Sequence, residues 1–221
     1  MKNSYSSWWY KYLLTPVMTL FGSITFNFLF KKYYNFTEED HSILRQKLKN
    51  NYYIILNYRK THLTTYLIGV ANFIKMGKWP LYCHAFLNVD DGLAKNDEEF
   101  KFVESTAPGV HFSSFMQVFD CDSVVLLRPK GMTDEEYTEL MDKYIDKTAD
   151  AQIGKPYDDL FDLMDDTRQS CVEVVRRCLM SIPDYETRFK NFEDMIKKEG
   201  NLLAQMYYDC PDFEKVWEVR K

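Results

Sequence analysis

Glycine and proline are scarce in this 221-residue chain, with eight and seven occurrences, and there are only five cysteines. So little glycine and proline excludes collagen-like, linker-like and low-complexity chains. The cysteines are widely spaced and include no C-x-x-C pair, so we expect neither a disulfide scaffold nor a zinc or redox motif. Free thiols in a reducing compartment, in the cytoplasm or in a larger assembly, are the expectation.

The chain also lacks an excess of positive charge. Lys and Arg number 28 against 33 Asp and Glu, which gives a net charge of -5. Binding to nucleic acid is therefore not expected, because its electrostatic footprint is missing. Apolar residues at 46% and aromatic residues at 16% can build a sizeable core and exclude global disorder.

One long uncharged run extends from Tyr12 to Phe30, between flanking lysines. Its nineteen residues could just cross a bilayer, which needs roughly 17–25, but a proline, a glycine and several polar residues dilute it. A helix packed on the domain or on a partner is favoured, with membrane insertion as the alternative. A secretory leader fits poorly, because no small-residue cleavage site follows. Residues 8–30, which begin with two tryptophans, are thus the candidate segment for docking on a membrane or a protein partner.

Stretches rich in aromatic and β-branched residues lie in the middle of the chain. We expect strands there at residues 52–58, 81–89, 100–105 and 123–128. Helical spacing, in several cases after a capping pattern such as Thr37 to Asp40, predicts helices at residues 41–49, 64–76, 133–149, 170–180 and 189–206. Strands in the middle and helices towards both ends predict an α+β fold.

The sequence Ser170-Cys171-Val172-Glu173 has the pattern of a capping box, which places Cys171 at the first position of a helix. Unpaired amides and the helix dipole favour an anion there, so they lower the pKa of a thiol and could stabilise an oxyanion. The other four cysteines lie in expected strands, helices or the tail, where a cysteine is usually a small buried hydrophobe.

A nucleophilic cysteine needs a base and a group that orients the base. Of the four histidines, His84 lies on an expected strand, whereas His111 is expected in a loop and His41 and His62 in polar surroundings. Glu104 lies inside the next apolar strand, where a charge needs a partner. Adjacent strands would bring Glu104 within reach of the His84 imidazole.

The order of these residues resembles the circularly permuted NlpC-type papain-like hydrolases, the YiiX-like group. The resemblance covers about residues 50–180. It rests on His84-Ala85, Gly92, Glu104 with Gly109-Val110, Gly154 to Asp158, and Cys171 with Glu173 and Val174.

The resemblance implies a papain-like core with a central antiparallel sheet packed on helices. It makes Cys171 the nucleophile, His84 the base and acid, Glu104 the orienting group and Tyr157 a cleft residue. It implies no cofactor and no metal. The core is expected at residues 50–182, between helical extensions at 1–49 and 183–221. The implied activity is hydrolysis of a peptide, isopeptide or acyl substrate through an acyl-cysteine.

Two other hypotheses remain open at this stage. The papain-like module could be catalytically weak or inactive and serve a structural or interaction role, in which case Cys171 and His84 need not meet. A metal-dependent enzyme would use His84 and Glu104 with nearby aspartates, although no H-E-x-x-H or comparable spacing supports it. The aspartates in question are Asp158, Asp159, Asp162, Asp165 and Asp166.

Overall fold

The computed structural model describes residues 36–49, 51–59, 65–66, 69–70, 73, 77–89, 99–158 and 162–220. Three expectations fall wholly or mostly outside this part of the chain: the uncharged run at 12–30 with the docking segment 8–30, the helix at 64–76, and the Gly92 of the resemblance. Within the described part, no helix combines the length and the apolar character that crossing a bilayer requires.

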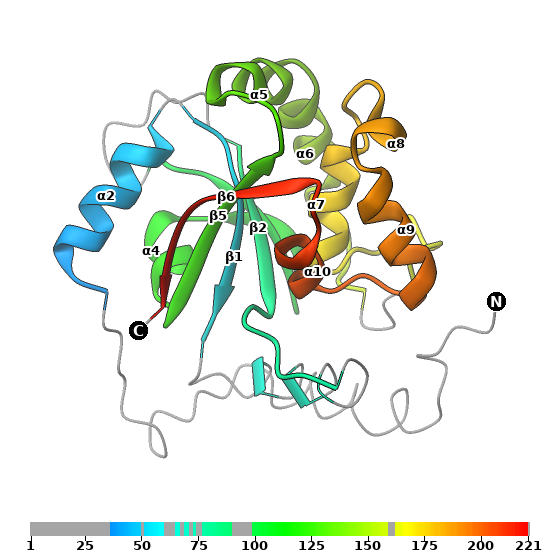
Figure 1. Ribbon diagram of the computed structural model, residues 1–221, viewed down its shortest axis with the longest axis horizontal. Helices are drawn as coiled ribbons and strands as arrows, with labels where there is room; N and C mark the ends of the chain where they lie inside the picture. Colours follow the sequence, from blue (N-terminus) through cyan, green and yellow to red (C-terminus); the bar gives the residue numbers. More distant parts are fainter. Residues whose placement is uncertain are drawn as a thin grey trace.

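A six-stranded antiparallel sheet forms the centre of the molecule (Figure 1). Its order is β4-β3-β2-β1-β5-β6. The strands are β1 (Ile54–Tyr58), β2 (His84–Asn88), β3 (Phe102–Thr106), β4 (Gly109–Ser113), β5 (Ser123–Pro129) and β6 (Phe213–Arg220). The expected α+β class with a central antiparallel sheet is therefore confirmed.

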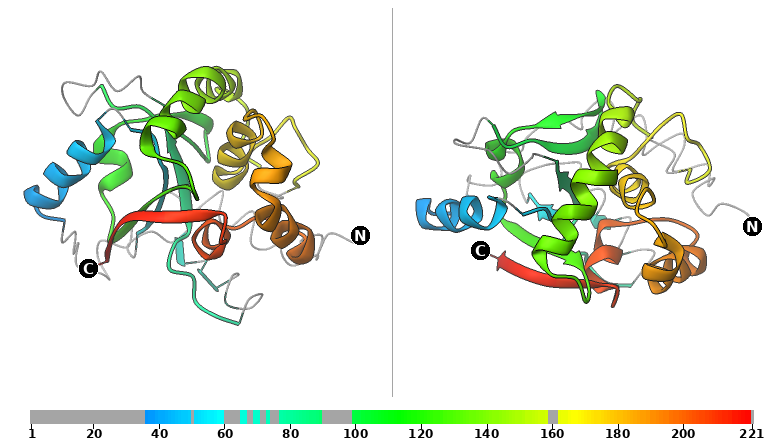
Figure 2. Two further views of the ribbon diagram at one scale, coloured as in Figure 1. Left: turned by 45° about the horizontal axis from the view of Figure 1, so that its top comes forward. Right: turned by 90° about the horizontal axis from the view of Figure 1, so that it is seen from above.

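Helices cover both faces of this sheet, so the fold has three layers (Figures 1 and 2). One face carries α2 (Glu38–Leu48) and α4 (Phe115–Phe119). The other face carries one long helical segment and four shorter helices. These are α5 (Asp134–Leu140) with the wider turn η2 (Met141–Ile145) and α6 (Asp146–Gln152), then α7 (Cys171–Leu179), α8 (Tyr185–Arg188), α9 (Lys190–Glu199) and α10 (Ala204–Asp209).

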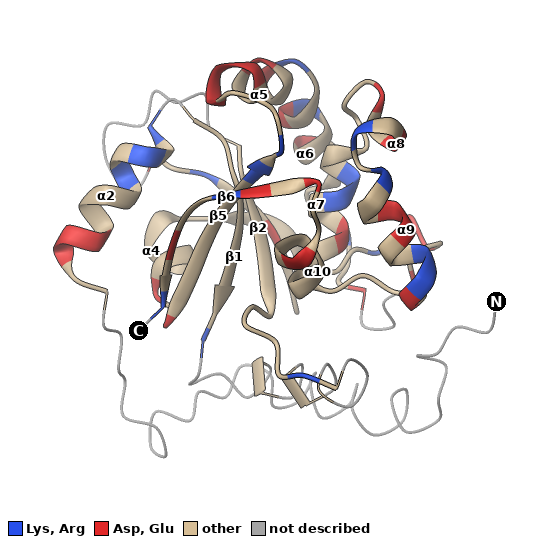
Figure 3. Cartoon of the chain, in the orientation of Figure 1, with Lys and Arg blue, Asp and Glu red and all other residues tan. Residues whose placement is uncertain are grey.

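Each central strand sends alternate side chains to the two layers, because successive residues of a strand face opposite sides. On β1, Ile54 and Leu56 join the core under α5 to α10, and Ile55 joins the core under α2 and α4. Strands buried on both faces read as largely apolar runs, and β1 and β2 accordingly carry no Lys, Arg, Asp or Glu (Figure 3). Lys, Arg, Asp and Glu are more frequent on the helices than on the central strands (Figure 3).

The structure differs from the sequence expectations at three places. His111 lies on strand β4 and not in a loop. The helix expected at 189–206 is interrupted, because α9 ends at Gly200, whose φ of 68° is left-handed. The C-terminal segment is not purely helical, since β6 pairs along β5 as an edge strand of the sheet.

The junction between β2 and β3 determines where the candidate site lies. The ladder between the two strands consists of Leu87 with Val103 and Asn88 with Phe102. Because the ladder has only these two pairs, the first residues of β2, which include His84, and the last residues of β3, which include Glu104, are not paired with each other. Helix α7 packs against both strands, so its N-terminus and these two side chains come to the same region.

Candidate active site

The N-terminus of α7 is fixed by the expected capping box. The Ser170 N–H donates to Oε2 of Glu173 at 2.6 Å, and Ser170 has the extended backbone of an N-cap. Cys171 is thus the first residue of the helix, where backbone amides have no acceptor within the helix. Ser170 is fully buried and Cys171 is 5% exposed.

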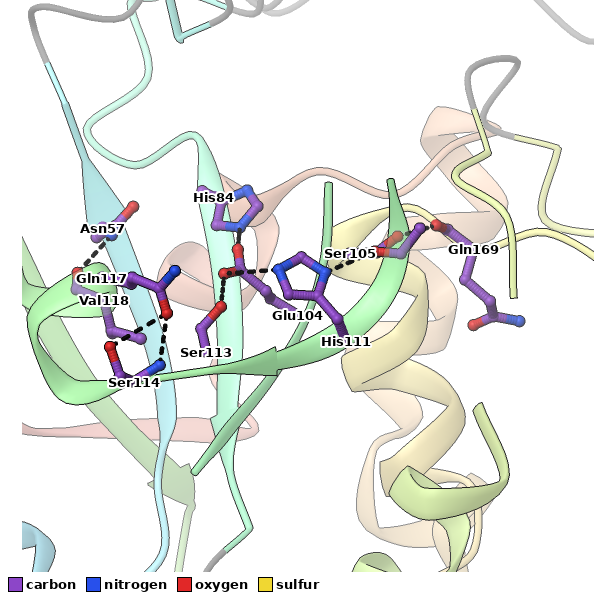
Figure 4. A network of polar contacts seen from close by, with 11 residues as sticks. Asn57, His84, Glu104, Ser105, His111, Ser113, Ser114, Gln117, Val118 and Gln169 are labelled. Carbon is purple, nitrogen blue, oxygen red and sulfur yellow. Dashed lines mark hydrogen bonds and ion pairs between the residues drawn. The ribbon is translucent and has the colours of Figure 1, made fainter. Parts of the chain in front are cut away.

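The residue before this cap is tied to the sheet and to a neighbouring loop. Ser105 on β3 donates its hydroxyl to the Gln169 carbonyl at 2.6 Å (Figure 4). The Gln169 N–H donates to the Pro156 carbonyl at 3.0 Å, and Gln169 forms an isolated parallel bridge with Tyr157. Tyr157 therefore lies beside the segment that leads into Cys171, and its role as a cleft residue stays a prediction.

The loop that carries Tyr157 is in turn fastened to β4. The Val110 N–H donates to the Lys155 carbonyl at 2.8 Å, and the Gly154 N–H donates to the Val110 carbonyl at 2.9 Å. Gly109 permits this contact in two ways, because its φ is 103° and a Cβ there would lie 2.3 Å from the Lys155 oxygen. The Gly109-Val110 pair therefore serves as the attachment point of the loop.

Residues of the C-terminal segment hold α7 from the side away from the sheet. The Tyr207 hydroxyl donates to the Val172 carbonyl at 2.9 Å. Arg176 binds Glu193 of α9 with two hydrogen bonds of 2.8 and 2.9 Å. Sequence reasoning treated this segment as an extension, whereas its contacts place it directly behind the cysteine helix.

His84 and Glu104 meet across the unpaired ends of β2 and β3. Nε2 of His84 lies 2.6 Å from Oε2 of Glu104 (Figure 4). The Cys171 thiol also lies close enough to the His84 imidazole for the two groups to interact electrostatically. Because Nε2 is taken by the carboxylate, Nδ1 is the ring nitrogen left for the sulfur. The structure thus brings the three predicted residues together.

The electrostatics of the three groups favour a charged imidazole. Burial lowers the pKa of His84, but the Cys171 thiolate and the Glu104 carboxylate outweigh burial and raise this pKa to about 10. Burial raises the pKa of Glu104, but hydrogen bonds from His84 and Ser113 and the positive charges of His84 and His111 hold it below its ordinary value. Glu104 is 6% exposed, so its charge is little screened by solvent.

The other four cysteines have surroundings that favour the neutral thiol. Burial raises the pKa of Cys83, Cys121 and Cys178 far above the ordinary value and that of Cys210 to about 12. All four are 5% exposed or less. The imidazole contact thus distinguishes Cys171 from the rest.

Sequence reasoning missed two residues of the site, Ser113 and His111, because it did not identify β4. The hydroxyl of Ser113 donates to Oε1 of Glu104, and Nε2 of His111 lies 3.6 Å from the same oxygen (Figure 4). The Pro108-Gly109 turn followed by a β-rich segment is the sequence signal that could have revealed this hairpin.

Two further acidic residues, Glu173 and Asp158, lie behind the cysteine. The carboxyl groups of Glu173 and Asp158 are 5% and 1% exposed and contact each other. Burial and the Asp158 carboxyl raise the pKa of Glu173 to about 7, although hydrogen bonds from Ser170 act in the opposite direction. Within the described part of the chain, no three His, Cys, Asp or Glu residues are grouped so as to hold a metal ion.

Comparisons of the chain with known proteins leave the site to be judged on its geometry. No protein-family model, no curated protein and no solved structure matches the chain.

Proposed function

We propose that the protein is a thiol-dependent hydrolase that cleaves an amide or ester through an acyl-cysteine intermediate. The observation that carries the proposal is an imidazole held by a buried carboxylate and lying close enough to Cys171, the first residue of α7, to interact with it electrostatically. A nucleophile, a base and an orienting group in mutual contact are the requirements of this chemistry.

In the first step, the Cys171 thiolate attacks the acyl carbon of the substrate. The carbonyl π electrons move to oxygen, and the backbone amide of Cys171 at the start of α7 is placed to donate to that oxyanion. The His84 imidazolium then gives its proton to the leaving nitrogen or oxygen as the bond to carbon breaks. An amine or alcohol departs, and the acyl group remains on sulfur as a thioester.

In the second step, neutral His84 accepts a proton from water, whose oxygen attacks the thioester carbon. The carbon–sulfur bond breaks, the carboxylic acid leaves, and the thiolate and imidazolium are restored. Glu104 acts throughout by stabilising the imidazolium and fixing the ring orientation, as its short contact with Nε2 implies.

The fold proposed with this chemistry is the circularly permuted papain-like core of the resemblance. The support is the chain order, with a strand-borne His84 before a helix-initial Cys171, and an α7 that packs on the central antiparallel sheet. Peptide, isopeptide and acyl substrates all present the required carbonyl. The contact between Cys171 and His84 favours an enzyme over the alternative of an inactive interaction module.

The test is alkylation by iodoacetamide at pH 7, followed by mass spectrometry of each cysteine peptide. Cys171 should react first. An ordinary cysteine has a pKa near 8.5 and is only about 3% thiolate at pH 7, so His84→Ala, which removes the base, should slow the reaction strongly. His41→Asn, on the distant helix α2, is the matched histidine control and should leave the rate unchanged.

A p-nitrophenyl ester then tests acyl transfer itself. The wild type should gain one acyl mass on Cys171, and Cys171→Ala should gain none. Similar alkylation rates for several cysteines, or a rate that is indifferent to His84→Ala, would refute the proposed function.

A further inference from the structure

The second oxygen of Glu104 has its own set of partners. Oε2 contacts His84, whereas Oε1 accepts the hydroxyl hydrogen of Ser113 and lies 3.6 Å from Nε2 of His111 (Figure 4). A glutamate side chain ends in two equivalent oxygens that can exchange places by rotation. Partners on one oxygen therefore fix the rotation of the carboxylate group, and this rotation presents the other oxygen to His84.

The strand register explains why these groups meet. Glu104 pairs directly with His111 between β3 and β4, and Phe102 pairs with Ser113. Ser113 is thus the diagonal neighbour of Glu104 on the same face of the sheet, within reach of a long side chain. The two β4 residues approach from the side opposite His84, so the carboxylate lies between two strands that both hold it.

The orientation of the His111 ring is also fixed. Its Nδ1 lies 2.8 Å from the Gly109 carbonyl, which can only accept, so Nδ1 carries a proton. Nε2 is then the nitrogen that faces Glu104. Among the described residues, the titratable groups that act on Glu104 are His84 on β2 and His111 on β4. Cys171 on α7 acts on Glu104 through its interaction with His84.

We propose that Ser113 and His111 are positioning residues that hold Glu104 ionised and turned towards His84. The proposal rests on the proposed function for its catalytic meaning. Ser113 is 3% exposed, so its hydrogen bond does not compete with water. The Ser113 hydroxyl donor and the nearby His111 ring each lower the pKa of Glu104 and so favour the carboxylate over the neutral acid.

The test is the pH dependence of Cys171 alkylation on its acidic side. A carboxyl with a depressed pKa stabilises its partner above that pKa and ceases to do so as the pH falls through it. Ser113→Ala removes one donor, which raises the pKa of Glu104. The acid limb should move to higher pH by about one unit, the equivalent of one hydrogen bond to a charged group.

Two further variants separate positioning from folding. Ser114→Ala removes a hydroxyl that donates to Oε1 of Gln117 in the cap of α4, and it should leave the acid limb in place. His111→Asn keeps an amide donor for the Gly109 carbonyl and removes the ring nitrogen that faces Glu104. His111 is 35% exposed, so the variant is expected to fold even where Ser113→Ala does not. Its acid limb should move in the same direction by a smaller amount.

The outcomes also distinguish this inference from the proposed function. Carbon-13 NMR titration of the Glu104 carboxyl reports its pKa whether or not Cys171 is reactive. A raised pKa in Ser113→Ala and His111→Asn supports the positioning role, even if His84→Ala leaves alkylation unchanged and the hydrolase fails. A Glu104 titration that neither variant alters would overturn the inference.

Discussion

Gly109→Ala should destabilise the protein far more than an equivalent substitution at another left-handed glycine. A Cβ at Gly109 would lie 2.3 Å from the Lys155 carbonyl oxygen, and contacts below 3.0 Å essentially do not occur. The β4 strand and the loop at 154–157 must therefore separate. Since both are backbone, neither can give way by rotating a side chain.

The size of the effect follows from two contributions. An alanine in the left-handed region costs about 1 kcal/mol or more. Separation breaks the two hydrogen bonds between Val110 and the loop, from the Val110 N–H to Lys155 and from the Gly154 N–H to Val110, at about 1 kcal/mol each. We expect a loss of about 3–4 kcal/mol, within the roughly 5–15 kcal/mol of a typical domain, so the variant should still fold at room temperature.

Gly131→Ala is the matched control. Gly131 has a φ of 78°, but a Cβ there meets nothing within 4 Å, so only the backbone cost of about 1 kcal/mol applies. For a domain of this size, about 2–4 °C in Tm corresponds to each kcal/mol. Circular dichroism on heating and in urea should show a drop of roughly 6–16 °C for Gly109→Ala and 2–4 °C for Gly131→Ala. Equal losses in the two variants would refute the close approach of β4 and the loop.

Two further predictions concern the site and its support. NMR titration of the histidine rings should place the pKa of His84 near 10 rather than near 6.5. Cys171→Ala should lower this pKa, because the sulfur then no longer offsets the burial of the ring. A His84 titration that Cys171→Ala leaves unchanged would contradict the interaction between the two residues. Glu193→Ala should cost about 3 kcal/mol of the free energy of unfolding, because it leaves the half-buried Arg176 and the Tyr185 hydroxyl without their shared acceptor. Asp166 forms an ion pair with Arg177, but the Asp166 side chain is 68% exposed. Asp166→Ala should therefore change the free energy of unfolding by less than about 0.5 kcal/mol. A similar cost for Glu193→Ala and Asp166→Ala would contradict this account.

Local sequence patterns predicted the local features of the fold well. The capping box at Ser170 and Glu173 and the one at Thr37 and Asp40 are present, because each depends on residues three apart. Strands β1, β2, β3 and β5 were recognised from their apolar and aromatic residues. Patterns of this kind work where one element buries its own side chains.

One of the elements that were missed, β6, depends on a distant partner. β6 carries four charged residues, Glu214, Lys215, Glu218 and Arg220, and it becomes a strand because it pairs with β5 some ninety residues earlier in the chain. An edge strand tolerates such charges, so its composition does not predict a strand. The proximity of Cys171 and His84 is likewise set by the packing of α7 against β2. Before the structure was known, only the family resemblance predicted that these two residues lie close together.

The short junction between β2 and β3 has a consequence for when the thiol gains its reactivity. The hairpin of β3 and β4 carries Glu104 together with Ser113, and it joins the remaining strands through few ladder pairs. The His84 imidazole on β2 therefore has no contact with the Glu104 carboxylate until this hairpin has packed against β2. Under the proposed function, Cys171 therefore behaves as an ordinary thiol during synthesis and folding, and it becomes a strong nucleophile only in molecules whose sheet is complete.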